Sequence, residues 1–279
     1  MSRPHTFIPP SGTRTHPLRT VRGDFAVLDV LPPTEPRGTA LLLPGYMGSK
    51  EDFIALLEPL SHAGYRVVAV DGRGQYETEG TDRQDTYGQG ELALDVLAQA
   101  AELDGPVHLL GHSLGGQIAR AAVLLDASPF RSLTLMSSGP AQVVEAQQLK
   151  VKMLGDALAT LSMAEVWAAM RALDPPEDAA AADGEGLRRR WLRHRAAQLI
   201  ATGRQLVTEP DRVAELAAVP LPVHVLSGER DDTWPVELLD TMAERLGARR
   251  TRIAGAEHSP NTDRPEQTAA ALVSFWDGV

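Results

Sequence analysis

"LLGHSLGGQIAR", residues 109–120, places a serine between glycines, where an apolar run ends and a helix-forming run begins. Gly111-His112-Ser113-Leu114-Gly115 fits the pattern G-x-S-x-G, in which the serine occupies a sharp turn from a strand into a helix. Glycines beside the serine let the strand and the helix approach without a Cβ clash. The same five residues are as typical of a serine that only caps a helix. The rest of the sequence must therefore decide the role of Ser113.

Around this stretch, short apolar runs alternate with segments of helical periodicity. Apolar runs without polar alternation are typical of strands that are buried on both faces. The predicted strands are residues 25–31, 39–45, 65–72, 106–113, 131–139, 221–228 and 250–255, and the predicted helices are residues 49–64, 90–103, 114–126, 235–247 and 265–276. This alternation predicts an α/β fold with a doubly wound, mostly parallel sheet. We expect residues 25–31 to form an edge strand.

The chain is predicted to form one core with an insertion. Residues 1–20 are expected to be an irregular arm, and residues 21–139 and 218–279 to form the core. Residues 140–217 are rich in Ala, Leu and Met, show helical periodicity broken at 174–186, and interrupt the alternation of strands and helices before it resumes. We therefore expect residues 140–217 to form a helical insertion over the sheet.

Composition excludes several classes of protein. With 27 Lys+Arg and 37 Asp+Glu, the formal net charge is −10, which disfavours a nucleic-acid binder. The absence of cysteine excludes disulfides, thiolate chemistry and cysteine-based zinc sites. Because the sequence has neither an apolar run of about 20 residues nor the apolar core of a secretory signal, we expect no membrane span and a cytoplasmic location. The sequence gives no indication of the oligomeric state.

A nucleophilic serine needs a base, and His258 is the histidine that the order of elements favours. The other seven histidines lie in the N-terminal arm, on predicted helices or strands, beside Ser113, or in the arginine-rich part of the insertion. His258, in "GAEHSP", follows the last predicted strand. Its loop is therefore expected at the carboxyl edge of the sheet, where Ser113 also lies.

The acid that orients the histidine is expected at another strand end, between the serine and the histidine in the chain. "GERDDTWP" supplies Asp231 and Asp232 after the predicted strand that ends at Gly228. We favour Asp231, which lies four residues before Pro235 at the start of the next helix, and Asp232 is its rival. One of the two carboxylates could serve only as a turn or N-cap acceptor.

Backbone N–H groups near Ser113 are candidates for an oxyanion hole, which stabilises the negative charge of a tetrahedral intermediate. Leu114 directly follows the serine, and the turn "GYMGSK" offers Tyr46, with Met47 as the weaker alternative. Apolar residues near these loops and in the insertion are candidates for a substrate pocket. They are Met47, Trp234, Met153 and Trp167.

Other patterns do not indicate a cofactor. "DGRGQYETEG" resembles a dinucleotide-binding loop but has Glu77 where the third glycine should be. No cluster of His, Asp and Glu has the spacing of metal ligands, so neither a metal nor a cofactor is expected. The arginine-rich run "GLRRRWLRHRAAQ" is either a docking patch for an anionic group or a solvated helix face, and the solvated face is favoured.

Taken together, these segments resemble the α/β-hydrolase superfamily over about residues 25–279. The resemblance rests on "LLLPGYMGS", "VVAVDGRGQ", "GHSLGG", "GERDDTWP" and "AEHSP", in this order, with the serine, acid and histidine in the order that this fold uses. It implies that the insertion forms a helical cap over the pocket. The chain departs from the pattern of many relatives at two places. Pro44 replaces a histidine at the turn "PGYMGS", which contains the candidate donor Tyr46 and is called the oxyanion turn. The segment "RGQYETEG" stands where many relatives have Arg-Gly-x-Gly.

The expected function is that of a cofactor-free serine hydrolase acting on a small-molecule acyl substrate. It would cleave a carboxylic ester, lactone or thioester through an acyl-enzyme at Ser113. The sequence leaves two alternatives open. The same three residues could serve carbon–carbon bond hydrolysis, acyl transfer or perhydrolysis, or the fold could be that of a ligand receptor without turnover.

Overall fold

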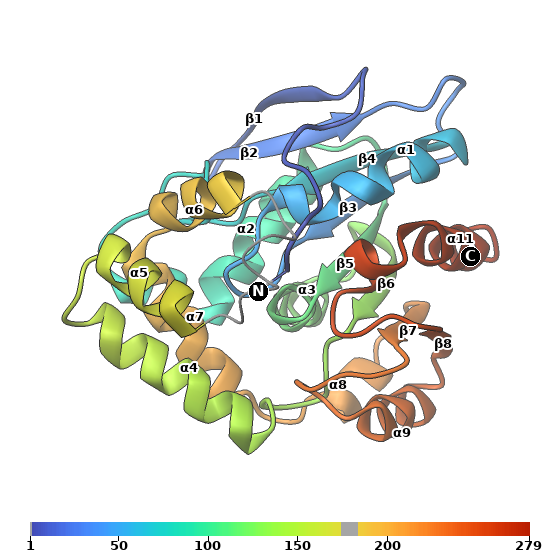
Figure 1. The fold of residues 1–279 in the computed structure, drawn as a ribbon. Coiled ribbons are helices and arrows are strands. Elements are labelled where there is room, and N and C mark those ends of the chain that lie inside the picture. The colour runs from blue at the N-terminus through green and yellow to red at the C-terminus, as the bar shows by residue number, and fades with distance from the viewer. Residues whose placement is uncertain (1, 174–183) are drawn as a thin grey trace.

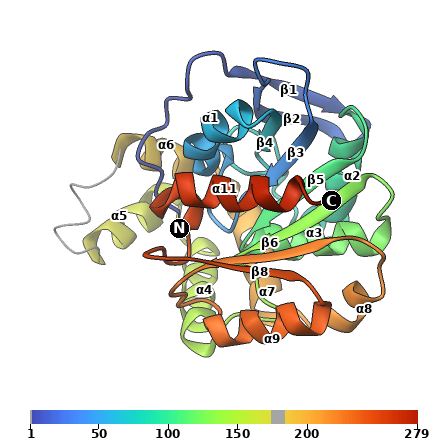
Figure 2. The same ribbon diagram turned by 90° about the vertical axis from the view of Figure 1, so that its right-hand side faces the viewer.

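A mixed sheet forms the centre of the molecule in the computed structural model, which describes residues 2–173 and 184–279 (Figures 1 and 2). The strands found in these ranges are β1 (Arg14–Thr20), β2 (Gly23–Val30), β3 (Gly38–Leu43), β4 (Tyr65–Val70), β5 (Val107–His112), β6 (Phe130–Met136), β7 (Val223–Gly228) and β8 (Arg249–Ile253). Their order in the sheet is β1-β2-β4-β3-β5-β6-β7-β8. The strands β4, β3, β5, β6, β7 and β8 run parallel to one another. Strand β2 pairs antiparallel with both of its neighbours, β1 and β4. The prediction of a doubly wound, mostly parallel sheet is confirmed.

Helices cover both faces of this sheet. The helices of the described ranges are η1 (Lys50–Phe53), α1 (Ile54–His62), η2 (Gln84–Tyr87), α2 (Gln89–Ala101), α3 (Leu114–Leu125), α4 (Glu145–Leu158), α5 (Met163–Leu173), α6 (Gly184–Arg193), α7 (Ala196–Thr208), α8 (Val213–Ala217), α9 (Val236–Leu246), α10 (Pro260–Asp263) and α11 (Pro265–Trp276). Helices α1 and α11 pack on one face, and α2, α3, α8 and α9 on the other (Figure 2). None of the helices described combines the length and the apolar character needed to cross a membrane.

Strand β3 shows why the apolar runs form buried strands. Successive side chains of a strand point to opposite faces of the sheet. Leu41 and Leu43 accordingly pack with the helices of one face, and Ala40 and Leu42 with those of the other. Because helices cover both faces, every position needs an apolar side chain, which produces a continuous apolar run rather than an alternating one.

The N-terminal part of the prediction is wrong in two respects. Residues Arg14–Thr20 form strand β1, although residues 1–20 were expected to be irregular. Since β1 occupies the edge of the sheet, β2 is an inner strand and not the predicted edge strand. The sequence did not predict β1 because Leu18 is its only buried residue, so the segment shows no apolar periodicity. It also contains Pro17, which lacks an N–H group and is tolerated at a sheet edge.

The insertion between β6 and β7 is helical. Helices α4 to α7 group on one side of the molecule (Figure 1) and share a small apolar cluster that includes Trp167 and Trp191. We call α4–α7 the cap. Helix α8 lies beside α9 instead and buries Val213 and Leu216 in the main core. The predicted break at 174–186 falls largely on residues 174–183, which lie outside the described residues, and α6 begins at Gly184.

Four histidines are buried as neutral side chains. Burial lowers the pKa of His108 and His194 to about 4, and that of His112 and His224 to about 3, from an ordinary value of 6.5. At least one ring nitrogen of each finds a neutral partner in the interior. His108 and His224 contact the hydroxyls of Ser132 and Thr251, while His112 and His194 contact backbone carbonyls.

We expect these histidines to make the fold sensitive to acid. Below pH 6.5 these histidines bind protons in the unfolded chain but not in the folded chain. Their contribution to the free energy of unfolding is therefore fully present above pH 6.5 and is lost as the pH falls toward 4. Each histidine contributes up to about 1.4 kcal/mol per pH unit in its window. Urea denaturation at a series of pH values measures this slope, and His224→Gln should reduce it by about one proton. A free energy of unfolding that stays constant between pH 6.5 and pH 4 would contradict the prediction.

Candidate active site

Ser113 lies at the junction of β5 and α3 in a backbone conformation that side chains rarely adopt. Its φ is 55° and its ψ is −119°, in the left-handed half of the map. The glycines around it allow this turn. A Cβ on Gly111 would overlap the carbonyl of Gly115, and a Cβ on Gly115 would lie 2.5 Å from the carbonyl oxygen of Leu43. The strained turn projects Ser113 at the carboxyl edge of the sheet.

His258 lies in the loop between β8 and α10, beside Ser113. Its Nε2 is 3.1 Å from the Ser113 Oγ, and its Nδ1 is 2.9 Å and 3.0 Å from the two carboxylate oxygens of Asp231. A neutral imidazole has one donor and one acceptor nitrogen. Since the carboxylate can only accept, Nδ1 carries the hydrogen and Nε2 is free to accept the Ser113 hydroxyl proton. The three side chains form one continuous hydrogen-bonded chain.

Asp231 and Asp232 have different surroundings. The side chain of Asp231 is fully buried, and its Oδ1 also accepts the backbone N–H groups of Thr233 at 2.8 Å and Trp234 at 3.2 Å. Asp232 is exposed, and its Oδ2 accepts a 2.7 Å hydrogen bond from the Gln147 amide on α4. The structure therefore brings Asp231 to His258 and turns Asp232 toward the cap.

The candidate oxyanion donors flank Ser113. Leu114 begins α3, so its N–H has no partner within the helix. On the other side, a Cβ added to Gly45 would lie 3.1 Å from the Cβ of Ser113, which shows how closely the turn after β3 passes. Tyr46 follows in this turn, and its hydroxyl donates to the Leu199 carbonyl of α7 at 3.0 Å. The Tyr46 side chain thus contacts the cap.

A cavity of about 690 Å³ opens at Ser113 and His258. Its core side includes Met47 and Val143. Its cap side consists of residues of α4 and α5, the turn between them, and Leu206 of α7. Of the predicted pocket residues, Met47 and Met153 line this cavity. Trp234 and Trp167 are not among its lining residues. Trp234 is buried behind His258, with its Nε1 donating to the Ala141 carbonyl at 2.9 Å, and Trp167 packs within the cap.

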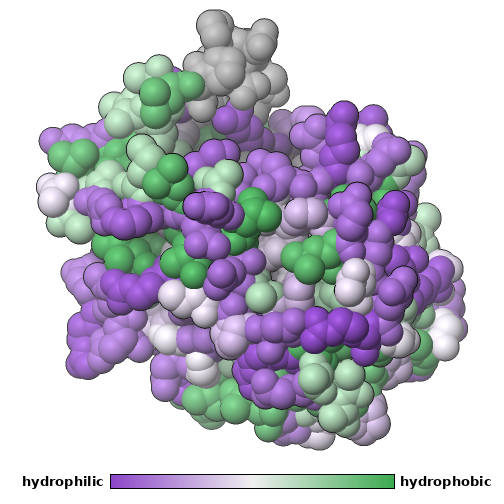
Figure 3. Space-filling view, turned by 90° about the horizontal axis from the view of Figure 1, so that it is seen from below, coloured by the Kyte–Doolittle hydropathy of each residue, from purple (hydrophilic) through white to green (hydrophobic). Residues whose placement is uncertain are grey.

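The cap side of the cavity is mostly apolar, with Gln147 and Lys150 of α4 as polar lining residues, and it is partly open to solvent. Met153, Leu161 and Leu173 line the cavity, yet 62%, 43% and 85% of their surface remains exposed. Seen from below, the molecular surface mixes such hydrophobic side chains with a larger number of hydrophilic ones (Figure 3). An apolar cavity of this size is typical of sites for small organic ligands.

Acidic residues near the oxyanion turn do not form a metal site. Glu51, Asp71 and Glu77 surround the buried Lys50 ammonium at 2.7–2.8 Å. Burial lowers the pKa of Lys50, but the neighbouring carboxylates raise it more, so the ammonium stays charged. Throughout residues 2–173 and 184–279, no group of three or more His, Asp or Glu side chains could hold a metal ion.

Comparison with known proteins identifies the family. A family model described as "Alpha/beta hydrolase family" matches residues 40–271, which is most of the chain. The chain belongs to the alpha/beta hydrolase family.

Individual members of this family resemble the protein in sequence or in fold. It is 29% identical over 233 residues to a pimeloyl-[acyl-carrier protein] methyl ester esterase of Aeromonas hydrophila, covering 78% of this chain and 87% of that protein. Its fold is similar to that of a hydrolase from Pseudomonas aeruginosa, with a TM-score of 0.77 and 22% identity over 96% of this chain and 99% of that chain. A thermophilic esterase from Thermogutta terrifontis has a TM-score of 0.75 and 20% identity, covering 95% of this chain and 98% of that one.

Two residues that support the site of this alpha/beta hydrolase escaped the sequence analysis. His112 Nε2 donates to the His258 carbonyl at 2.9 Å, because a carbonyl oxygen can only accept, and so holds the backbone of the loop that carries His258. Gln75 donates from Nε2 to the Gly45 carbonyl at 3.1 Å and accepts the Gly72 N–H at 2.9 Å. It thereby links the oxyanion turn to the loop after β4. Neither contact leaves a periodic or motif signal in the sequence.

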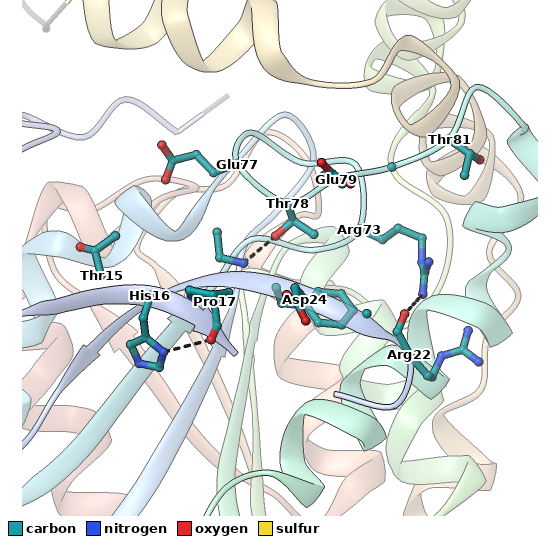
Figure 4. Close-up of a pocket in the computed structure, with 14 residues that line it drawn as sticks. Thr15, His16, Pro17, Arg22, Asp24, Arg73, Glu77, Thr78, Glu79 and Thr81 are labelled. Atoms are coloured by element: carbon teal, nitrogen blue, oxygen red, sulfur yellow. Dashed lines mark hydrogen bonds between the residues drawn. The ribbon is translucent and has the colours of Figure 1, made fainter. Parts of the chain in front are cut away.

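A second cavity of this alpha/beta hydrolase, of about 840 Å³, lies between the β1–β2 hairpin and residues 73–81 (Figure 4). Neither Ser113 nor His258 lines it. Its arginines are already paired, since Arg22 and Arg73 both bind the carboxylate of Asp95. The larger cavity is therefore separate from the chain of hydrogen bonds at Ser113.

Proposed function

We propose that this alpha/beta hydrolase is a cofactor-free serine hydrolase that cleaves a carboxylic ester, lactone or thioester through an acyl-enzyme at Ser113. The observation that carries the proposal is the unbroken series of hydrogen bonds from Asp231 through His258 to the Ser113 hydroxyl. This series ends at a serine that opens into an apolar cavity. A base in contact with the hydroxyl and a carboxylate in contact with the base are the arrangement that activates a serine.

In the proposed mechanism, the Ser113 oxygen attacks the carbonyl carbon of the substrate while His258 Nε2 accepts the hydroxyl proton. Asp231 holds the Nδ1–H tautomer and stabilises the resulting imidazolium. The backbone N–H groups of Tyr46 and Leu114 donate to the developing oxyanion, each lowering the barrier by about 3 kcal/mol. His258 then donates its proton to the leaving group, which departs and leaves the acyl-enzyme. Water then attacks the acyl carbon as His258 takes one of its protons, and His258 returns this proton to the Ser113 oxygen as the acid departs.

An ester is the substrate class with the most support. The relative from Aeromonas hydrophila is by name a methyl ester esterase, and it matches 78% of this chain. The cavity supports the same class, because apolar residues of α4 and α5 would contact an acyl chain attached to Ser113. Its volume of about 690 Å³ fits a small-molecule ester rather than a polymer.

The test is covalent labelling with a fluorophosphonate probe, which reacts with activated serines. We expect stoichiometric labelling of the wild-type protein, with the modified peptide containing Ser113. His258→Ala should slow labelling by orders of magnitude because the base is lost. Labelling that persists unchanged in His258→Ala, or that maps to another serine, would contradict the proposal.

A further inference from the structure

The first residues of the chain run between the cap helices and the core (Figure 1). We call residues 2–8 the N-terminal strap. Its Phe7 packs against the apolar cluster of the cap, and Ser2 and Pro4 are buried. The strap therefore contacts the helical insertion as well as the catalytic side of the core.

Arg190 of α6 fixes the strap in place. Its side chain is fully buried and forms an ion pair with the equally buried Asp52, with Nη1 2.6 Å from Oδ1. The other terminal nitrogen, Nη2, donates to the Ser2 carbonyl at 2.6 Å, and the guanidinium lies 5.6 Å from the centre of the Phe7 ring. A buried guanidinium needs partners for its donors. The Ser2 carbonyl supplies one of them, so the strap belongs to the folded structure.

Ser2 also forms part of the cavity that contains Ser113 and His258. Its Oγ is 3.0 Å from the Oγ of Ser259, the residue that directly follows His258. Only 8% of the Ser2 surface is exposed. One wall of the cavity is thus made by the second residue of the chain.

We propose that the N-terminal strap determines the length of the ester chain that the cavity accepts, with Ser2 as the wall on the His258 side. This inference rests on the function proposed above. A small side chain at position 2 leaves room beside His258, and the buried Arg190–Asp52 pair prevents the wall from yielding. A larger side chain at position 2 shortens the cavity, and removal of the strap opens it.

Two variants with opposite expected effects test the proposal. Ser2→Phe should lower kcat/KM for decanoyl esters at least about tenfold relative to acetyl esters, because a pocket discriminates chains by the space it leaves. Deletion of residues 2–8 should shift the ratio toward long chains. Ser11→Phe, the same substitution at an exposed position outside the cavity, should retain the wild-type ratio.

The readouts separate this proposal from the proposed function. Equal chain-length profiles for Ser2→Phe and wild type would overturn the role of the strap, even if the deletion variant does not fold. Absence of both hydrolysis and labelling in the wild type would overturn the proposed function. In that case, the rise in melting temperature on adding acetate or decanoate still tests the role of Ser2. Ser2→Phe should abolish the rise caused by decanoate and keep the rise caused by acetate. An equal decanoate shift in Ser2→Phe and wild type would overturn it.

Discussion

Ser113→Ala is expected to lower kcat for ester hydrolysis by about 10⁶-fold. In the proposed mechanism the variant loses the atom that attacks the carbonyl carbon, while the candidate backbone donors and the cavity remain. Initial rates with a p-nitrophenyl ester measure the loss, and circular dichroism verifies that the fold is retained. A Ser113→Ala variant with wild-type rates would show that another group performs the chemistry.

The strained backbone at Ser113 supplies a matched control. Ser113→Gly should be as inactive as Ser113→Ala but more stable, because glycine adopts a φ of 55° without steric cost. Relief of strain of this kind is worth about 1–3 kcal/mol. Thermal melting of the two variants measures the difference. Equal melting temperatures would indicate that the turn stores no strain.

Asp231→Asn is expected to lower kcat by about 10⁴-fold with little effect on folding. The asparagine oxygen can still accept the N–H groups of Thr233 and Trp234, so the loop keeps its shape. Its amide then faces His258 Nδ1 as a donor and favours the tautomer that cannot accept the Ser113 proton. Steady-state kinetics and the rate of fluorophosphonate labelling should fall together.

Asp232→Asn is the control for this prediction. The side chain of Asp232 is exposed and contacts Gln147 rather than His258. We expect the variant to retain kcat within about twofold, because Asp232 lines the cavity without contacting His258 and asparagine has nearly the same shape as aspartate. If Asp232→Asn were the more damaging substitution, the assignment of the acid would be reversed.

The core of the fold could be predicted because its physical cause is local in the sequence. Strands such as β3 are buried on both faces, and that burial requires the continuous apolar runs that were recognised. Ser113, Asp231 and His258 could be grouped because each follows a parallel strand, and the carboxyl ends of such strands share one edge of the sheet. Their hydrogen-bond distances follow that expectation.

The remaining features depend on contacts that the sequence does not encode locally. Strand β1 is mostly polar because it lies at the edge of the sheet and places only Leu18 in the core, while backbone hydrogen bonds to β2 hold the rest of the strand. Gln75 reaches the Gly45 carbonyl across thirty residues of sequence, and no pattern distinguishes it from a surface glutamine. Trp167 and Trp234 were candidates for the pocket because they are large and apolar. They are buried elsewhere, since packing geometry rather than residue type decides which apolar side chains line a cavity.

The contact between Ser2 and Ser259 also bears on the order in which the protein is built. These residues are 257 positions apart, so the N-terminal strap leaves the ribosome long before the loop that it contacts exists. Contacts at such separation in sequence require much of the chain to be ordered first. We therefore expect this part of the cavity wall to form late in folding, after the sheet and the cap have assembled. A tag fused ahead of Ser2 in a recombinant protein would be joined to the chain at the wall of the cavity.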